Sequence, residues 1–97
     1  MSEELQSEFA EEMAKTYELS AKFGHSPARF IHLAEGYGAV NAAKKLVISS
    51  DINSGLKKLK KRGKLDLAME SVMLNERYES LFTKDELAAA RWRLSSI

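Results

Sequence analysis

Several residue types are scarce in this chain of 97 residues, and each scarcity excludes a class of structure or chemistry. The sequence has no cysteine, one proline and two histidines. Without cysteine there is no disulfide framework and no thiolate metal site, and without a His-x-x-x-His pair we expect neither a metal centre nor a cofactor. A single proline removes only one backbone donor, and the dominance of alanine, leucine, lysine and glutamate favours helices.

Long apolar runs are also missing. The chain starts with MSEELQSEFAEEM, which is acidic and polar where a signal peptide would carry a basic and then an apolar segment. No apolar stretch approaches the roughly 20 residues of a membrane-spanning helix. We therefore expect a cytoplasmic protein with no membrane association.

Groups suited to catalysis are few. No serine stands beside a plausible general base, and the short Gly-Tyr-Gly stretch at Gly36 cannot form a phosphate loop. Glu70 lies among apolar residues, so its burial would require a basic partner such as Arg77 or Arg91, and an internal ion pair is the default explanation. We predict that the protein is not an enzyme and assign no catalytic residue.

Helical periodicity predicts an all-α fold, because no stretch alternates as a strand would. The segment 3–23 has no helix breaker and a thin apolar stripe, as expected of a long amphipathic helix. The predicted architecture is a compact orthogonal bundle of five or six short helices with a longer N-terminal helix. We divide it into an acidic amphipathic helix at 1–24 and a helical domain at 25–97, within one globular unit.

Local signals predict where the shorter helices begin. Ser26 and Pro27 have the residue types of a helix start, Asp66 is expected to cap a central helix, and Thr83 and Glu86 have the spacing of a capping box. The helix after Pro27 is expected to bury its apolar residues, which are Phe30, Leu33, Ala34 and Tyr37.

Positive charge is concentrated in one segment, although the net charge of the chain is only +1. Residues 44–64 contain eight bases and one acid, giving +7, whereas residues 1–24 contain six acids and two bases, giving −4. Charges separated by more than about 10 Å are screened from one another, so the basic segment can present a positive patch. In a helix over 54–62, Leu56 and Leu59 would share a narrow apolar sector and the bases would occupy the remaining circumference.

This basic helix has two interpretations. Lysines can simply solvate an exposed helix, but here no glutamates alternate with them to relieve their repulsion. Duplex DNA offers a phosphate charge about every 1.7 Å of its axis, so we predict contact with the nucleic-acid backbone and little sequence preference. A helix-turn-helix over 39–63 fits less well, because its turn would be long and its second helix lacks residues that read bases. The predicted nucleic-acid-binding residues are Lys44, Lys45, Lys57, Lys58, Lys60, Lys61, Arg62 and Lys64.

A protein-binding module is the competing prediction. Arg91, Trp92 and Arg93 combine the residue types most often found as interface hot spots. The stripe of the N-terminal helix could supply a second surface, pairing with a partner helix or with a second copy of the chain as a homodimer. Under this alternative the protein is an adaptor or an inhibitor of a nuclease.

Three stretches of the sequence also resemble a known family. They are GAVNAAKKL from Gly38, GLKKLKKRGKLDLAMESVML from Gly55 and LFTKDELAAARWRL from Leu81. Their order and spacing resemble a small, largely uncharacterised bacterial helical domain, over residues 26–94. The resemblance implies association with bacterial or phage nuclease and restriction-like proteins, as a freestanding chain or a fused domain. Family members often carry aromatic, acidic or apolar residues where this chain has Lys60, Lys61 and Arg62.

Overall fold

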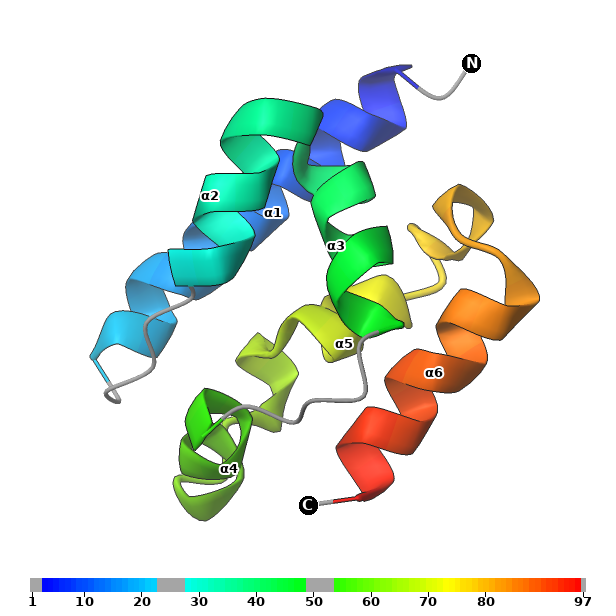
Figure 1. The fold of residues 1–97 in the computed structure, drawn as a ribbon. Helices are drawn as coiled ribbons and strands as arrows, with labels where there is room; N and C mark the ends of the chain where they lie inside the picture. Colours follow the sequence, from blue (N-terminus) through cyan, green and yellow to red (C-terminus); the bar gives the residue numbers. More distant parts are fainter. Residues whose placement is uncertain (1–2, 23–27, 49–53, 97) are drawn as a thin grey trace.

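All regular elements in the described part of the chain are helices (Figure 1). The structure, a computed structural model, describes residues 3–22, 28–48 and 54–96. The α-helices are α1 (Glu3–Ala21), α2 (Ala28–Tyr37), α3 (Ala39–Val47), α4 (Ser54–Lys61), α5 (Met69–Met73) and α6 (Lys84–Ser95). Two short 3-10 helices, η1 (Leu65–Leu67) and η2 (Glu79–Leu81), lie before and after α5. The predicted all-α bundle with a longer N-terminal helix is confirmed.

A glycine in a left-handed conformation joins α2 to α3. Gly38 has a φ of 86°, a region that a side chain with a Cβ atom rarely adopts. Its N–H donates to the Ala34 carbonyl at 2.8 Å, and its carbonyl accepts from the Ala42 N–H at 3.0 Å. The turn lets α2 and α3 pack closely together, and it directs α3 toward α1 and α6.

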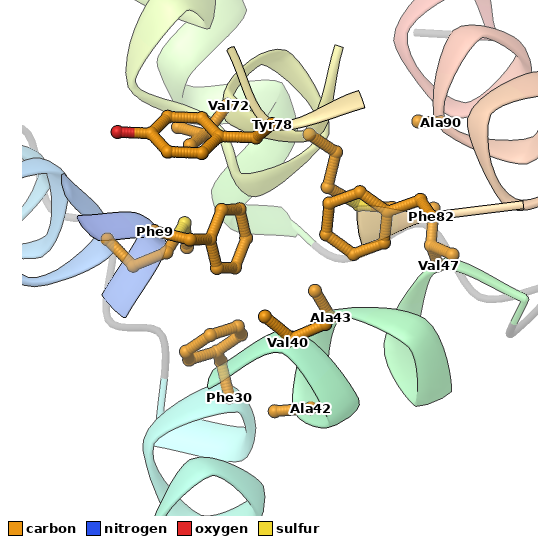
Figure 2. Close-up of a cluster of buried hydrophobic side chains, with 12 residues drawn as sticks. Phe9, Phe30, Val40, Ala42, Ala43, Val47, Val72, Tyr78, Phe82 and Ala90 are labelled. Carbon is orange, nitrogen blue, oxygen red and sulfur yellow. The ribbon is translucent and has the colours of Figure 1, made fainter. Parts of the chain in front are cut away.

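One main core joins α1, α2, α3, α5 and α6 (Figure 2). The Phe9 ring from α1 makes edge contacts with Tyr78 and Phe82, at centroid distances of 5.5 and 5.4 Å. Aromatic pairs of this geometry add to the stabilisation that comes from burying apolar area. Four residues of the predicted stripe, Phe9, Met13, Thr16 and Ser20, are buried, Leu5 is partly buried against the same core, and Phe23 lies outside the described residues. This stripe is therefore not available to pair with a second copy of the chain, as the homodimer hypothesis required.

The predicted start of the last helix is confirmed. The Thr83 hydroxyl accepts a hydrogen bond from the Glu86 N–H at 3.1 Å, and the Glu86 carboxylate accepts one from the Thr83 N–H at 2.9 Å. These reciprocal bonds form a capping box, which satisfies two backbone donors that the helix itself cannot pair.

Two local expectations are wrong. Tyr37, the last residue of α2, is 57% exposed, and its ring lies against the Lys45 ammonium, 4.6 Å from the ring centroid, instead of in the core. Asp66 does not cap α5, because η1 intervenes and α5 begins only at Met69, with Ala68 in the N-cap position. The predicted helix start at residues 26 and 27 lies outside the described residues.

Candidate nucleic-acid interface

The helix α4 rests on a small apolar cluster that is separate from the main core. Leu56 and Leu59 are 3% and 0% exposed, and they pack with the buried Ala68. Their spacing of three residues places both leucines on one face of α4. Leu94 of α6 also packs against this cluster, so α4 lies beside the carboxyl-terminal end of α6 (Figure 1).

A second left-handed glycine ends α4. Gly63 has a φ of 68°, its N–H donates to the Lys60 carbonyl at 3.0 Å, and the Lys64 N–H donates to the Leu59 carbonyl at 2.8 Å. This pair of hydrogen bonds is the Schellman arrangement, which satisfies carbonyls left unpaired at a helix end. The turn keeps the backbone of 62–64 next to the helix, so that its bases extend the charged surface of α4.

The bases of α4 and of its terminal turn form one exposed surface, which we call the α4 basic face. Its members are Lys57, Lys58, Lys60, Lys61, Arg62 and Lys64, all of them exposed. The ion pairs described within 3–22, 28–48 and 54–96 do not include Lys57, Lys60, Lys61 or Arg62. The acidic amino-terminal half of α1 lies at the opposite end of the molecule from α4 (Figure 1). Its carboxylates therefore do not lie across these four cations.

The α1 acid Glu8 instead pairs with Arg77, in the segment between α5 and η2. The hydrogen bond from the Arg77 guanidinium lowers the pKa of the Glu8 carboxyl below its ordinary value. Both side chains are well exposed, so we expect this pair to add little to stability. This acidic group of α1 is therefore paired without involving the bases of α4.

The lysines of α3 are placed differently from those of α4. The Lys44 ammonium bonds to the Glu86 carboxylate at 2.9 Å, with its side chain 30% exposed, and it lies 5.6 Å from the centroid of the Phe82 ring. Lys44 therefore joins α3 to the start of α6, and we remove it from the predicted binding set. Lys45 is exposed but lies over the Tyr37 ring rather than beside α4.

The Lys44 contact also affects the carboxyl that it touches. Burial alone would raise the pKa of Glu86, but hydrogen bonds from the Thr83 backbone and from Lys44 outweigh burial and hold it below its ordinary value. The carboxylate thus stays ionised while it completes the capping box. One acid serves both the helix start and the link between α3 and α6.

The three predicted protein-binding residues of α6 do not share one surface. Arg93 is 3% exposed, and its Nε donates to the Glu70 carboxylate at 2.6 Å inside the protein. The partner of Glu70 is therefore Arg93, and the expectation of Arg77 or Arg91 is wrong. Successive residues of a helix point about 100° apart, so the burial of Arg93 turns its neighbour Trp92 toward solvent.

Trp92 and Arg91 remain at the surface. Trp92 is 53% exposed, which makes it one of the few large apolar side chains in the described chain that the fold leaves in water. Arg91 is also exposed. Ala90 on the same helix is fully buried, so Trp92 lies away from the face of α6 that packs into the core.

Known proteins do not identify the chain or its interface. Comparison with models of protein families, with curated proteins and with solved structures found no match. Within the described residues, acidic and histidine side chains nowhere gather in a group of three or more that could hold a metal ion. None of the described helices is both long enough and apolar enough to cross a membrane. Function must therefore be argued from the surface of this chain.

Proposed function

We propose that the protein binds nucleic acid through the α4 basic face, contacting the phosphate backbone without catalysing a reaction on it. The observation that supports this proposal is the exposure of all six bases on one short helix and its terminal turn. Four of them, Lys57, Lys60, Lys61 and Arg62, are free of the described ion pairs. A contiguous cationic surface of this kind displaces counterions from a polyanion and so gains affinity that falls with salt.

The internal energetics of α4 favour an external anion. Lysines three and four residues apart repel one another, as Lys57 does Lys60 and Lys61, and Leu56 and Leu59 are the buried residues in the described part of this helix. The helix dipole favours cations in the last turn, but only by about 0.3–1 kcal/mol each. Bound phosphates would remove the repulsion that remains.

The residue types favour backbone contact over base reading. Lysine acts as a mobile point charge, whereas recognition of base edges relies on arginine, asparagine or glutamine held in a groove. The α4 basic face has five lysines and one arginine, Arg62, and it includes no asparagine or glutamine. We therefore expect affinity that varies little with base sequence.

A charge-reversal variant tests the proposal. Lys57→Glu, Lys60→Glu and Lys61→Glu together should weaken binding to a random-sequence duplex or single strand about tenfold to a hundredfold at moderate salt. Fluorescence anisotropy of a labelled oligonucleotide across a salt titration measures this change. The slope of log affinity against log salt should also become shallower, by about 0.9 for each duplex phosphate that the variant no longer neutralises.

A second triple variant controls for net charge. Lys15→Glu, Lys22→Glu and Lys84→Glu change exposed lysines elsewhere, and both triples take the net charge from +1 to −5, since each reversal subtracts two units. The control should keep most of the wild-type affinity. Equal losses in the two triples, or no wild-type binding at low salt, would contradict the proposal.

The wider setting we propose is an accessory role beside a bacterial or phage nuclease or restriction-like protein. This part rests on the resemblance of the three motifs from Gly38, Gly55 and Leu81 alone.

Because we propose no catalysis, nucleic acid incubated with the protein and a divalent metal ion should be recovered intact. Strand cleavage that tracks the purified protein would contradict this part of the proposal.

The protein-binding alternative has one observation in its favour, the exposure of Trp92. Its other two supports are weaker, because Arg93 is buried and the α1 stripe packs into the main core. An adaptor or inhibitor would have to act through Arg91 and Trp92. We therefore rank it second.

A further inference from the structure

Trp92 is held in solvent by the residues that follow it. Arg93 is fixed inside the protein by its bond to Glu70, and Leu94 packs against the cluster beneath α4. These two contacts set the rotation of α6 about its own axis. At about 100° per residue, Trp92 points about 160° away from Leu94, so its indole cannot turn inward without breaking them.

The last turn of α6 is also closed by hydrogen bonds at Trp92. The hydroxyls of Ser95 and Ser96 donate to the Trp92 carbonyl, at 3.0 and 2.7 Å. They add side-chain donors to a backbone carbonyl in the last turn of the helix. The indole is thus attached to a fixed backbone and is presented to solvent as a flat surface.

A single exposed apolar side chain is ordinary in proteins, so the location of Trp92 matters more than its exposure. Leu94 packs against the cluster that also holds α4, so the last turn of α6 and α4 lie at the same end of the molecule (Figure 1). The exposed Arg91 lies on the circumference of α6 between these sites, about 60° from Leu94 and about 100° from Trp92. Arg91 therefore supplies one exposed cation on α6 between the side that meets the α4 cluster and the exposed indole.

From this placement we infer that the nucleic acid bound at α4 is single-stranded, and that Trp92 stacks on one of its bases. The inference rests on the proposed function, because α4 supplies the phosphate contacts. Proteins that bind single strands combine a positive track for the backbone with aromatic side chains for the bases. In a duplex the bases are already stacked on one another and present no free face to Trp92. DNA and RNA single strands share this chemistry.

Tryptophan fluorescence gives a direct test, because Trp92 is the only tryptophan in the chain. The intact protein is titrated at low salt with oligodeoxythymidine, with oligouridine and with a duplex of equal length. Stacking of a base on the indole should quench the tryptophan emission in the titration with oligodeoxythymidine, with oligouridine or with both. Quenching by only one of the two single strands would identify the ligand as DNA or as RNA. The duplex should bind through α4 without quenching.

Two variants of the same residue separate stacking from structure. Trp92→Ala should lower affinity for the responding single strand about fivefold to a hundredfold and leave duplex affinity unchanged. Trp92→Phe, which keeps an aromatic face, should restore most of the loss. Because the indole is more than half exposed, both variants should keep the wild-type circular dichroism spectrum and melting temperature.

The outcomes distinguish this inference from the proposed function. Equal affinity for single strand and duplex, with emission unchanged, would overturn the inference and leave backbone binding by α4 intact. Loss of duplex affinity in Trp92→Ala would also overturn it, since Trp92 would then act on the fold or on the backbone. Unchanged emission with no binding of any nucleic acid would overturn both and favour Trp92 as a protein-binding residue.

Discussion

The main core and the cluster beneath α4 differ in size and in what their helices leave exposed. The main core joins five α-helices and contains large buried side chains such as Phe9, Met13 and Met73. The α4 cluster has only Leu56, Leu59 and Ala68 fully inside it. Most of the buried apolar side chains that stabilise the fold lie in the main core, whereas the positive charge lies on α4, on the side that faces away from its small cluster. The charged residues of α4 can therefore change with little effect on the rest of the protein.

The largest effect should come from the aromatic centre of the main core. Phe9→Ala removes a fully buried ring that joins α1 to Tyr78 and Phe82, and we expect a loss of about 3–5 kcal/mol in the free energy of unfolding. Urea denaturation followed by circular dichroism measures it. A loss below about 1 kcal/mol would mean that α1 is not an integral part of the core.

Breaking the buried ion pair should cost nearly as much. Arg93→Ala leaves the Glu70 carboxylate, with 5% of its side chain exposed, without its guanidinium partner, and we expect a loss of about 3 kcal/mol or more. The double variant Glu70→Leu, Arg93→Met should recover most of that stability, because no charge is then buried. If the double variant is no more stable than Arg93→Ala, then packing by the arginine side chain matters more than its charge.

The α4 cluster should give a smaller and more local effect. Leu59→Ala should lower stability by about 2–3 kcal/mol, at the lower end of the range for buried leucine, because few apolar neighbours surround it. Hydrogen exchange should show faster opening of α4 than of α1 or α3 in this variant. Equal acceleration throughout the protein would show that the two clusters unfold together.

The link between α3 and α6 should depend on pH. Glu86 has a lower pKa in the folded protein than in the unfolded chain, so its contribution is complete above the unfolded value of about 4.3 and is lost as the pH falls through the folded value. Compared with Glu86→Gln, the wild type should be about 1 kcal/mol more stable near neutral pH. This difference should vanish in acid, as measured by urea denaturation at each pH. A constant difference would show that Glu86 acts through packing alone.

The smallest effect on stability should come from the α4 basic face. Lys57→Glu, Lys60→Glu and Lys61→Glu should change the free energy of unfolding by less than about 1 kcal/mol, because exposed charges contribute little and the wild-type cations repel one another. The melting temperature of this triple should stay close to that of the wild type. A large drop would mean that these side chains support the fold, and the comparison between the two clusters would fail.

Local features of the fold could be predicted from the sequence because their causes lie within a few residues. The Thr83 and Glu86 capping box, the end of α4 at Gly63 and the burial of Leu56 and Leu59 each follow from spacing along one helix. The exposure of the α4 bases follows from the same periodicity. These are the features on which the proposed interface depends.

Features decided by contacts between helices could not be predicted in the same way. Glu70 pairs with Arg93 rather than Arg91 because the rotation of α6 against α5 selects which arginine points inward. Lys44 looked like part of a basic patch, but packing of α3 on the start of α6 brings it to Glu86. The intervening η1 likewise displaced the expected helix cap from Asp66. The spacing of residues along one helix does not determine which side chains of two different helices meet.

The contact of Phe9 with Tyr78 and Phe82 has a consequence for the order of folding in the cell. A growing chain leaves the ribosome from its amino terminus at about 5–20 residues per second, so the Phe9 ring emerges seconds before its two aromatic partners. Contacts between residues so distant in sequence form slowly, because a long loop must close first. The core therefore closes only after Tyr78 and Phe82 have left the ribosome, and until then the apolar stripe of α1 is exposed to chaperones.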